Sequence, residues 1–242
     1  PNAHWHVVEA DEFDRSFHHL HPTHAAITTV DPDHLDVYDQ KEALHEAFVQ
    51  FGSQVSETLL LPEGLPWPAV DGPQIRRFEV VQAGMKSKAA YHAILQSDAQ
   101  TATFCLAENP LFKAKVSLPG KHNVANALVA AALAHCAGLP PSTIAKGMEH
   151  FQGVHRRFDV HLDSQTKVFV DDYAHHPTEL QALIDAVKAG WPHRHITLIF
   201  QPHLYSRTRD FMAEFAQALG SVDQVWLLPI YPAREQPIPG VD

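Results

Sequence analysis

The sequence predicts an α/β fold that contains a parallel sheet. In the last third of the chain, strand-like apolar stretches alternate with stretches whose apolar residues recur at helical spacing. A β-α-β-α-β order of this kind implies right-handed crossovers between parallel strands. Two polar loops, 171–177 and 200–209, each follow a strand-like stretch. They are therefore expected at the carboxyl ends of strands, where open parallel sheets bind their ligands.

The first half of the chain is less regular. Two short strands are expected at 5–8 and 25–30, because both stretches are apolar and each ends in an acidic loop. A helix is expected from Lys41, where four apolar residues share one stripe, with Gly52 as its end. The prolines and short alternating runs of 53–118 indicate hairpins and loops.

The second half is more periodic. An Ala-rich helix at 123–138 and a second one near 144–151 precede a junction at 153–158. The remaining elements are expected in the order strand 167–170, helix 178–190, strand 195–200, helix 209–220 and strand 224–230. The junction suggests two domains, 1–155 and 156–242.

Composition excludes several classes of protein. The chain has 242 residues and 45% apolar content, enough for one large domain or two smaller ones with a real core. A net charge of −10 argues against a general nucleic-acid binder. The longest apolar stretch, 124–137, is too short to span a membrane, and the first residues lack the features of a signal peptide. The only two cysteines suit reduced core positions in the cytoplasm. Both ends read as interrupted elements, so a fragment is expected.

Acidic residues suggest a cation site near the first two strands. Glu9 opens an acidic loop, and Asp33 with His34 follows the second strand. Oxygen ligands of this kind favour Mg²⁺ or Mn²⁺. Two solvated acidic loops explain the same pattern equally well.

Four histidines, at positions 18, 19, 21 and 24, lie close together in the sequence and raise the question of zinc. A closed zinc site needs four oriented nitrogen or sulfur ligands, and no cysteine is near. Surface or loop histidines are therefore the favoured interpretation.

Two amides and one arginine are candidates for nucleotide contacts. Asn123 and Asn126 lie three apart on one helix face, and amides can donate to and accept from a purine edge. A helix cap at Asn123 is the simpler alternative. Arg157 lies at the junction, where its planar guanidinium suits phosphate or an inter-domain ion pair.

The two polar loops carry the remaining candidates. Asp172 stands at a strand end, where it could accept a hydrogen bond from a ribose hydroxyl. Tyr173, His175, His203 and Arg207 could line a cleft for an anionic substrate. A buried structural network is the alternative.

Taken together, these motifs resemble the Mur ligase family, whose members are ATP-dependent enzymes that build the peptidoglycan precursor. The resemblance covers nearly the whole chain and is weakest over 53–115. The motifs that carry it are, in order, Glu9 to Glu12, Asp33-His34, Gly120 to Asn123 with Asn126, Phe151 to Phe158, Asp171 to Glu179, Phe200 to Asp210, and Tyr231 to Pro239.

The family has three domains, for the UDP-sugar, for ATP, and a carboxy-terminal Rossmann-like one. By resemblance, residues 1 to about 155 are the later part of the central ATPase domain, and the remainder is the first part of the third. The family's phosphate-binding Gly-Lys-Thr loop does not occur in these 242 residues. The chain by itself is therefore expected to be inactive.

The resemblance also implies roles for individual residues. It makes Glu9 and His34 magnesium ligands, Asn123 and Asn126 contacts to the nucleotide base, Arg157 a phosphate contact, Asp172 the ribose acceptor, and Tyr173, His175, His203 and Arg207 residues of the substrate cleft. Some family members carry an arginine directly after the residue matching His203. Leu204 stands there in this chain, so the role of that arginine is not carried over.

The amino-acid sequence of the two loops is most similar to the branch of the family that joins L-alanine to UDP-N-acetylmuramate. The implied reaction uses ATP and Mg²⁺ and passes through an acyl phosphate. Three alternatives remain open at this stage: a relative that recycles a tripeptide, a phosphohydrolase that uses a metal, and a nucleotide-binding module without catalysis. The phosphohydrolase would use Glu9, Asp33, His34 and the pair His175-His176. Alanine itself and the oligomeric state cannot be read from these residues.

Overall fold

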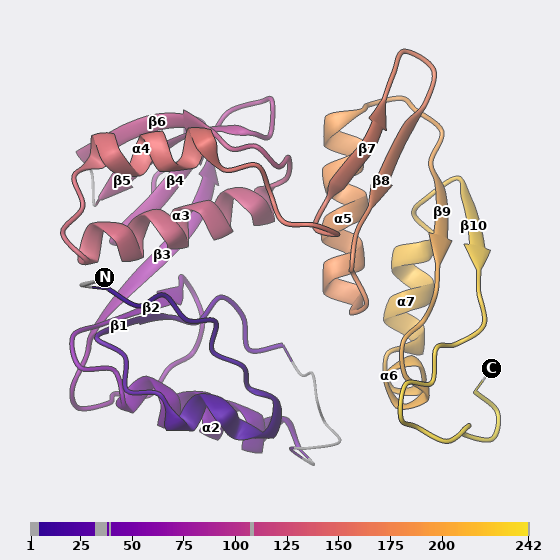
Figure 1. The fold of residues 1–242 in the computed structure, drawn as a ribbon, viewed down its shortest axis with the longest axis horizontal. Helices are drawn as coiled ribbons and strands as arrows, with labels where there is room; N and C mark the ends of the chain where they lie inside the picture. The colour runs from indigo at the N-terminus through magenta and orange to yellow at the C-terminus, as the bar shows by residue number, and fades with distance from the viewer. Residues whose placement is uncertain (1–4, 32–37, 39, 107–108, 242) are drawn as a thin grey trace. The chain divides into compact units, whose positions relative to one another are not determined.

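A computed structural model describes residues 5–31, 38, 40–106 and 109–241 (Figure 1). The chain forms two compact units that interleave in sequence. The first comprises 1–94, 103–113 and 125–146, and the second comprises 95–102, 114–124 and 147–242. Each unit is described by itself below.

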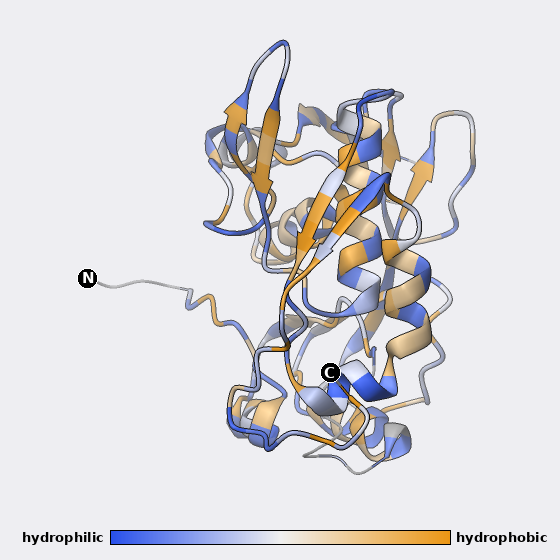
Figure 2. Ribbon diagram, turned by 90° about the vertical axis from the view of Figure 1, so that its right-hand side faces the viewer, coloured by the Kyte–Doolittle hydropathy of each residue, from blue (hydrophilic) through white to orange (hydrophobic). Residues whose placement is uncertain are grey.

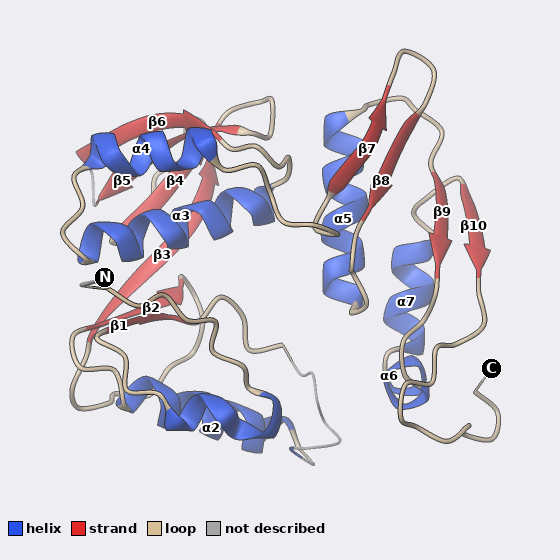
Figure 3. Cartoon of the chain, viewed as in Figure 1, coloured by secondary structure: helices blue, strands red, loops and turns tan. Residues whose placement is uncertain are grey.

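The described chain contains both helices and strands (Figure 3). In order they are η1 (Phe13–His19), β1 (His24–Ala26), α2 (Lys41–Ser53), β2 (Thr58–Pro62), β3 (Gln74–Gln82), β4 (Tyr91–Leu95), β5 (Thr101–Leu106), β6 (Asn109–Lys115), α3 (Lys121–Cys136), α4 (Pro141–His150), β7 (Asp159–Asp163), β8 (Val168–Asp171), α5 (Pro177–Gly190), β9 (Thr197–Phe200), α6 (Tyr205–Asp210), α7 (Met212–Leu219) and β10 (Gln224–Leu227). The predicted α/β class is confirmed.

The largest sheet has six strands in the order β1-β2-β3-β4-β5-β6. The pairs β1–β2 and β2–β3 are parallel, with Leu59 opposite both Ala25 and Ile75. Leu59, Leu60 and Leu61 are all fully buried, so β2 is covered on both faces. A continuous apolar run of this kind is typical of a parallel strand in an α/β protein.

The helix expected from Lys41 is confirmed as α2, but the role expected for Gly52 is wrong. Gly52 lies inside the helix, which continues to Ser53. A Cβ atom at Gly52 would lie 2.7 Å from the Trp67 ring and 3.0 Å from Leu59. Glycine is needed there for close packing, since the apolar face of α2 packs with β2 in one core cluster.

Two of the early strand predictions need correction. Residues 5–8 form no strand; they are exposed, and Trp5 stacks on His24 at a ring-centroid distance of 5.6 Å. The strand expected at 25–30 is limited to His24–Ala26, because its pairing with β2 extends only from Thr58 to Leu60. The region 53–118, expected to hold hairpins and loops, contains the strands β2 to β6.

The second unit has a core of its own beside the strand pair β9–β10. The two strands are parallel and in register, as expected, from Thr197 opposite Gln224 to Phe200 opposite Leu227. The helices α5 and α7 pack on β9 through five buried residues, Leu180, Ile184, Phe200, Phe215 and Ala218. Figure 2 shows the apolar residues concentrated in strands and on one side of helices.

Three details of this unit were not predicted. β7 was missed, and among the described strands it pairs with β8 in an antiparallel hairpin. β8 therefore does not extend the parallel pair β9–β10 in the described sheets. The helix expected over 209–220 is two helices, because Phe211 has the non-helical angles φ −119° and ψ 23°.

Among the described helices, none is both long and apolar enough to cross a lipid bilayer.

Candidate functional site

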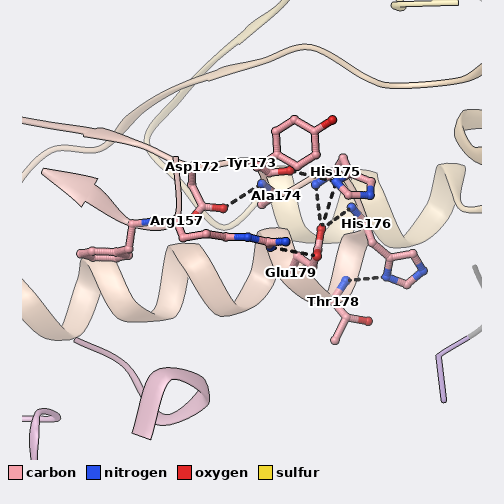
Figure 4. Close-up of polar contacts among 9 residues, drawn as sticks. Arg157, Asp172, Tyr173, Ala174, His175, His176, Thr178 and Glu179 are labelled. Atoms are coloured by element: carbon pink, nitrogen blue, oxygen red, sulfur yellow. Dashed lines mark hydrogen bonds and ion pairs between the residues drawn. The ribbon is translucent and has the colours of Figure 1, made fainter. Parts of the chain in front are cut away.

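The loop that follows β8 leads directly into the capped end of α5. Pro177 begins the helix, where its missing N–H costs nothing. His176 is the cap, and its Nδ1 accepts a hydrogen bond from Thr178 N at 3.3 Å. Oε2 of Glu179 accepts from the backbone N–H of His176 at 3.2 Å and of His175 at 3.0 Å (Figure 4). This capping box holds the loop against the helix.

Asp172 ties the same loop to the segment before β7. Its Oδ2 accepts from Phe158 N and its Oδ1 from Ala174 N, both at 2.7 Å. The Phe158 ring is buried and stacks on Trp191 at a centroid distance of 6.1 Å. Both carboxylate oxygens of Asp172 are thus oriented by backbone donors before any ligand binds.

Two adjacent arginines face this loop. Arg157 Nη1 lies 3.6 Å from Glu179 Oε1, and both side chains are partly exposed (Figure 4). Arg156 Nε lies 3.8 Å from Asp171 Oδ2, and its guanidinium lies over the Tyr173 ring at 4.9 Å. The ion pair of Arg157 lies within the second unit.

The second loop, after β9, meets the first. The His203 ring lies 6.1 Å from the His175 ring, centroid to centroid, and stacks on Tyr231 at 5.5 Å. Arg207 is 6% exposed, and its Nη1 lies 3.2 Å from His203 Nδ1. Leu204 has a φ of 72°, a strained value for a residue with a Cβ atom, and turns the chain into α6. The two polar loops therefore lie together, as their positions in the sequence predicted.

Two acidic residues of this cluster were missed from sequence. Glu179 had a local signal, since an acid three residues after a helix cap is the capping-box spacing. Glu235 had none, because it comes from a distant loop and accepts from Ser206 N at 3.0 Å. Burial acts to raise the pKa of the Glu235 carboxyl, but the hydrogen bonds from Ser206 outweigh it, so the pKa lies below its ordinary value.

Comparison with known proteins identifies the family. Residues 2–134 match the model of the Mur ligase middle domain, and residues 156–241 match that of the Mur ligase, glutamate ligase domain. The chain belongs to the Mur ligase family.

Relatives within the Mur ligase family share one name. A UDP-N-acetylmuramate–L-alanine ligase of Flavobacterium johnsoniae is 42% identical over 240 residues, which are 97% of this chain and 51% of that protein. The protein of the same name from Porphyromonas gingivalis is 42% identical over 238 residues, which are 97% of this chain and 52% of that protein. The chain thus spans about half the length of the curated relatives it matches.

A solved Mur ligase structure has the same fold. The UDP-N-acetylmuramate-alanine ligase of Thermotoga maritima aligns with a TM-score of 0.69 and 28% identity, over 90% of this chain and 48% of that one. A murein peptide ligase of Psychrobacter arcticus aligns with a TM-score of 0.56 at 20% identity, which shows a common fold alone.

The two asparagines of the Mur ligase resemblance lie in α3. Asn123 Nδ2 donates to Pro119 O at 2.8 Å, so part of its hydrogen-bonding capacity serves the start of the helix. Asn126 is exposed. In the turn that precedes α3, Gly120 has a φ of +106°, and a Cβ atom there would lie 2.8 Å from the Cβ of Ala186. The turn before α3 therefore needs glycine.

The predicted metal ligands are only partly described. Glu9 is exposed in an irregular segment, whereas His34 and Asp33 lie outside the described residues. Within the described part of the chain, no group of three or more His, Cys, Asp or Glu side chains could hold a metal ion. In the early histidine cluster, His18 Nε2 contacts Ala47 O at 2.8 Å and His24 lies 3.7 Å from Glu57. His18 lies in η1, and His24 begins β1 with a side chain that is 8% exposed, so the expectation of surface or loop histidines is wrong for these two.

Proposed function

We propose that the full-length protein carrying this chain is an ATP-dependent ligase that joins L-alanine to UDP-N-acetylmuramate, a step in peptidoglycan precursor synthesis. The name shared by relatives that are 42% identical supports this. The structural observation that carries it is the meeting of the two loops, which gathers Asp172, His175, His203 and Arg207 in one unit.

The proposed reaction forms an amide bond at the expense of ATP. The muramoyl carboxylate attacks the γ-phosphorus, ADP leaves, and an acyl phosphate results. The amine of alanine then attacks the carbonyl carbon, and the C–O bond to phosphate breaks. Positioning and charge compensation dominate such chemistry.

The residues of the second unit fit a nucleotide. The Asp172 oxygens are aligned by two backbone donors and retain lone pairs for a ribose hydroxyl. The Arg157 side chain is 53% exposed, and its guanidinium has further N–H groups beyond the one near Glu179, which suits a phosphate. The remaining carbonyl oxygen of Asn123 is a proposed contact to the base, and the exposed amide of Asn126, a residue of the first unit, is proposed as another.

Magnesium, when bound, would neutralise charge on the phosphates. Glu9 offers the oxygen ligand that Mg²⁺ prefers, and it is exposed. His34 is proposed as the second ligand of the Mg²⁺ ion.

A boundary between a central domain, 1–155, and a carboxy-terminal domain, 156–242, is also proposed, since the second family match begins at residue 156. A cytoplasmic location is proposed because Cys105 and Cys136 are free thiols.

The comparisons favour none of the alternatives, and one assay separates them. Phosphate release by the full-length protein is measured with ATP, with and without UDP-N-acetylmuramate and L-alanine. The proposal expects release only when both substrates are present, with the amide product formed in equal amount. Release without an amine, dependent on Mn²⁺ or Zn²⁺, would instead indicate a phosphohydrolase. Preference for a tripeptide over alanine would indicate a recycling ligase, and ATP binding without turnover a binding module.

A further inference from the structure

The partners of the His175 ring determine which of its nitrogens carries the proton. His175 Nδ1 lies 2.9 Å from the carbonyl oxygen of Tyr173 and 3.4 Å from Glu179 Oε2. A carbonyl oxygen only accepts hydrogen bonds, so Nδ1 must be the N–H. In the neutral ring, Nε2 is then the nitrogen with a lone pair, and it can take up a proton.

The partners of His203 impose the opposite arrangement. Its Nδ1 lies 3.2 Å from Arg207 Nη1. A guanidinium only donates, so Nδ1 of His203 must accept, and the neutral ring carries its proton on Nε2. Arg207 is buried, which keeps this contact away from bulk water. His203 is therefore a donor at Nε2.

These two rings with opposite tautomers are neighbours. Their centroids are 6.1 Å apart and their planes are inclined by 64°. A carboxylate, Glu179, lies behind His175, and a guanidinium, Arg207, lies behind His203. The carboxylate compensates the charge of an imidazolium at His175, whereas the guanidinium opposes a second positive charge at His203. Tyr173 also packs against the His175 ring, and Tyr231 against the His203 ring.

We infer that His175 is the general base of the ligation and that His203 is a hydrogen-bond donor in it. This inference rests on the proposed function. As the amine nitrogen of alanine bonds to the carbonyl carbon, His175 Nε2 takes its proton. The Nε2–H of His203 donates to the oxygen that becomes negative in the tetrahedral intermediate. When the C–O bond breaks, phosphate leaves with the electron pair, and His175 returns the proton to phosphate or water.

Glutamine variants separate a base from a donor. The glutamine amide can donate and accept, so it can reproduce the hydrogen-bond pattern of either ring, but it cannot take up a proton. In the full-length protein, His175→Gln is expected to lower kcat by about 10²–10⁴-fold. His203→Gln is expected to stay within about tenfold of the wild type, because it keeps a donor. His195→Gln is the matched control, since the His195 side chain, two residues before β9, is 65% exposed.

The tautomers can also be read directly. Long-range ¹H–¹⁵N correlation spectra of histidine-labelled full-length protein, recorded at about pH 8, above the ordinary histidine pKa, distinguish the two forms. We expect Nδ1–H at His175 and Nε2–H at His203, with the variants providing the assignment. His176 is an internal reference for the second form, because its Nδ1 accepts from Thr178 N.

Two results would overturn the inference. One is a kcat loss in His203→Gln that equals or exceeds that in His175→Gln, with thermal stability unchanged in both. The other is the same tautomer at both rings. The tautomer measurement does not depend on the substrate, so it remains informative if the protein fails to ligate alanine. A protein that ligates alanine but shows the reversed order of variants refutes this inference alone.

Discussion

Arg207 donates to Nδ1 of His203 at 3.2 Å, and the arginine residue is only 6% exposed. A buried charge of this kind is costly unless its donors are used. The pair joins the start of α6 to the loop after β9, one turn apart on the chain. Its burial predicts an effect on stability, and its position beside His175 predicts an effect on turnover.

Replacing the guanidinium with an apolar side chain should therefore damage the acceptor side of the reaction. Arg207→Met removes the guanidinium that donates to His203 Nδ1. Loss of this charge-assisted hydrogen bond should lower the free energy of unfolding by about 1.5–3 kcal/mol. We expect a lower kcat and altered kinetics with alanine, measured by phosphate release, and a lower urea midpoint. Arg209→Met is the control, because the Arg209 side chain is 53% exposed and pairs with its neighbour Asp210. Unchanged kinetics with both UDP-N-acetylmuramate and alanine would count against a role for Arg207.

Glu179 combines a helix cap with two charged contacts, and these can be separated. Glu179→Gln keeps an acceptor for the N–H groups of His175 and His176, but it loses the charge beside Arg157. Stability should change little, because exposed ion pairs contribute about 0–1 kcal/mol. Turnover should fall. Glu179→Ala also loses the capping box, and we expect about 1 kcal/mol less stability in denaturant titrations.

The control for Glu179 is a charge removed from the same helix. Asp185→Asn changes an exposed residue of α5 whose Oδ1 accepts from Gln181 at 2.9 Å. If Glu179→Gln and Asp185→Asn have the same kcat, the Glu179 charge has no part in the reaction.

Asp172 should matter more for ATP than for the UDP-sugar. Asp172→Ala removes the acceptor for two backbone N–H groups and the proposed contact to the ribose. We expect the KM for ATP to rise more than the KM for UDP-N-acetylmuramate. Asp171→Ala is a close control, since the Asp171 carboxylate lies 3.8 Å from Arg156 and is partly exposed. An unchanged apparent affinity for ATP in Asp172→Ala would refute the assignment.

His122 predicts a loss of stability in mild acid. Burial lowers the pKa of the His122 imidazole, whereas Asp172 and Asp185 act in the opposite direction. The unfolded chain therefore binds a proton more readily than the folded chain. Stability should fall as the pH drops below about 6.5, the ordinary value for histidine.

The measurement is the thermal midpoint as a function of pH. Between about pH 7.5 and pH 5.5, a range centred on the ordinary histidine value, His122→Gln should show a flatter profile than the wild type. His195→Gln is the control for removal of an exposed imidazole, since the His195 side chain is 65% exposed. A slope that His122→Gln leaves intact would assign the acid sensitivity to other groups.

The hydrophobic periodicity of the sequence predicted the long helices correctly but did not predict the short elements. The stripe of α2 and the apolar spacing of α5 predicted both helices, because an amphipathic helix records its buried face over several turns. β7 escaped because it is only five residues long and mostly exposed, although its polar and apolar residues alternate. The break at Phe211 escaped because no proline or glycine marks it in the sequence.

The candidate site shows the same division. The sequence by itself determined membership of the Mur ligase family, the α/β class and the presence of two polar loops at strand ends, because these depend on local composition and order. Only the tertiary structure decided that Glu179 and Glu235 join the cluster, and that His175 and His203 hold their protons on different ring nitrogens. A histidine's tautomer is set by the partner of its other nitrogen. For His175 that partner is the carbonyl of Tyr173 and for His203 it is the guanidinium of Arg207, and residue type alone specifies neither contact.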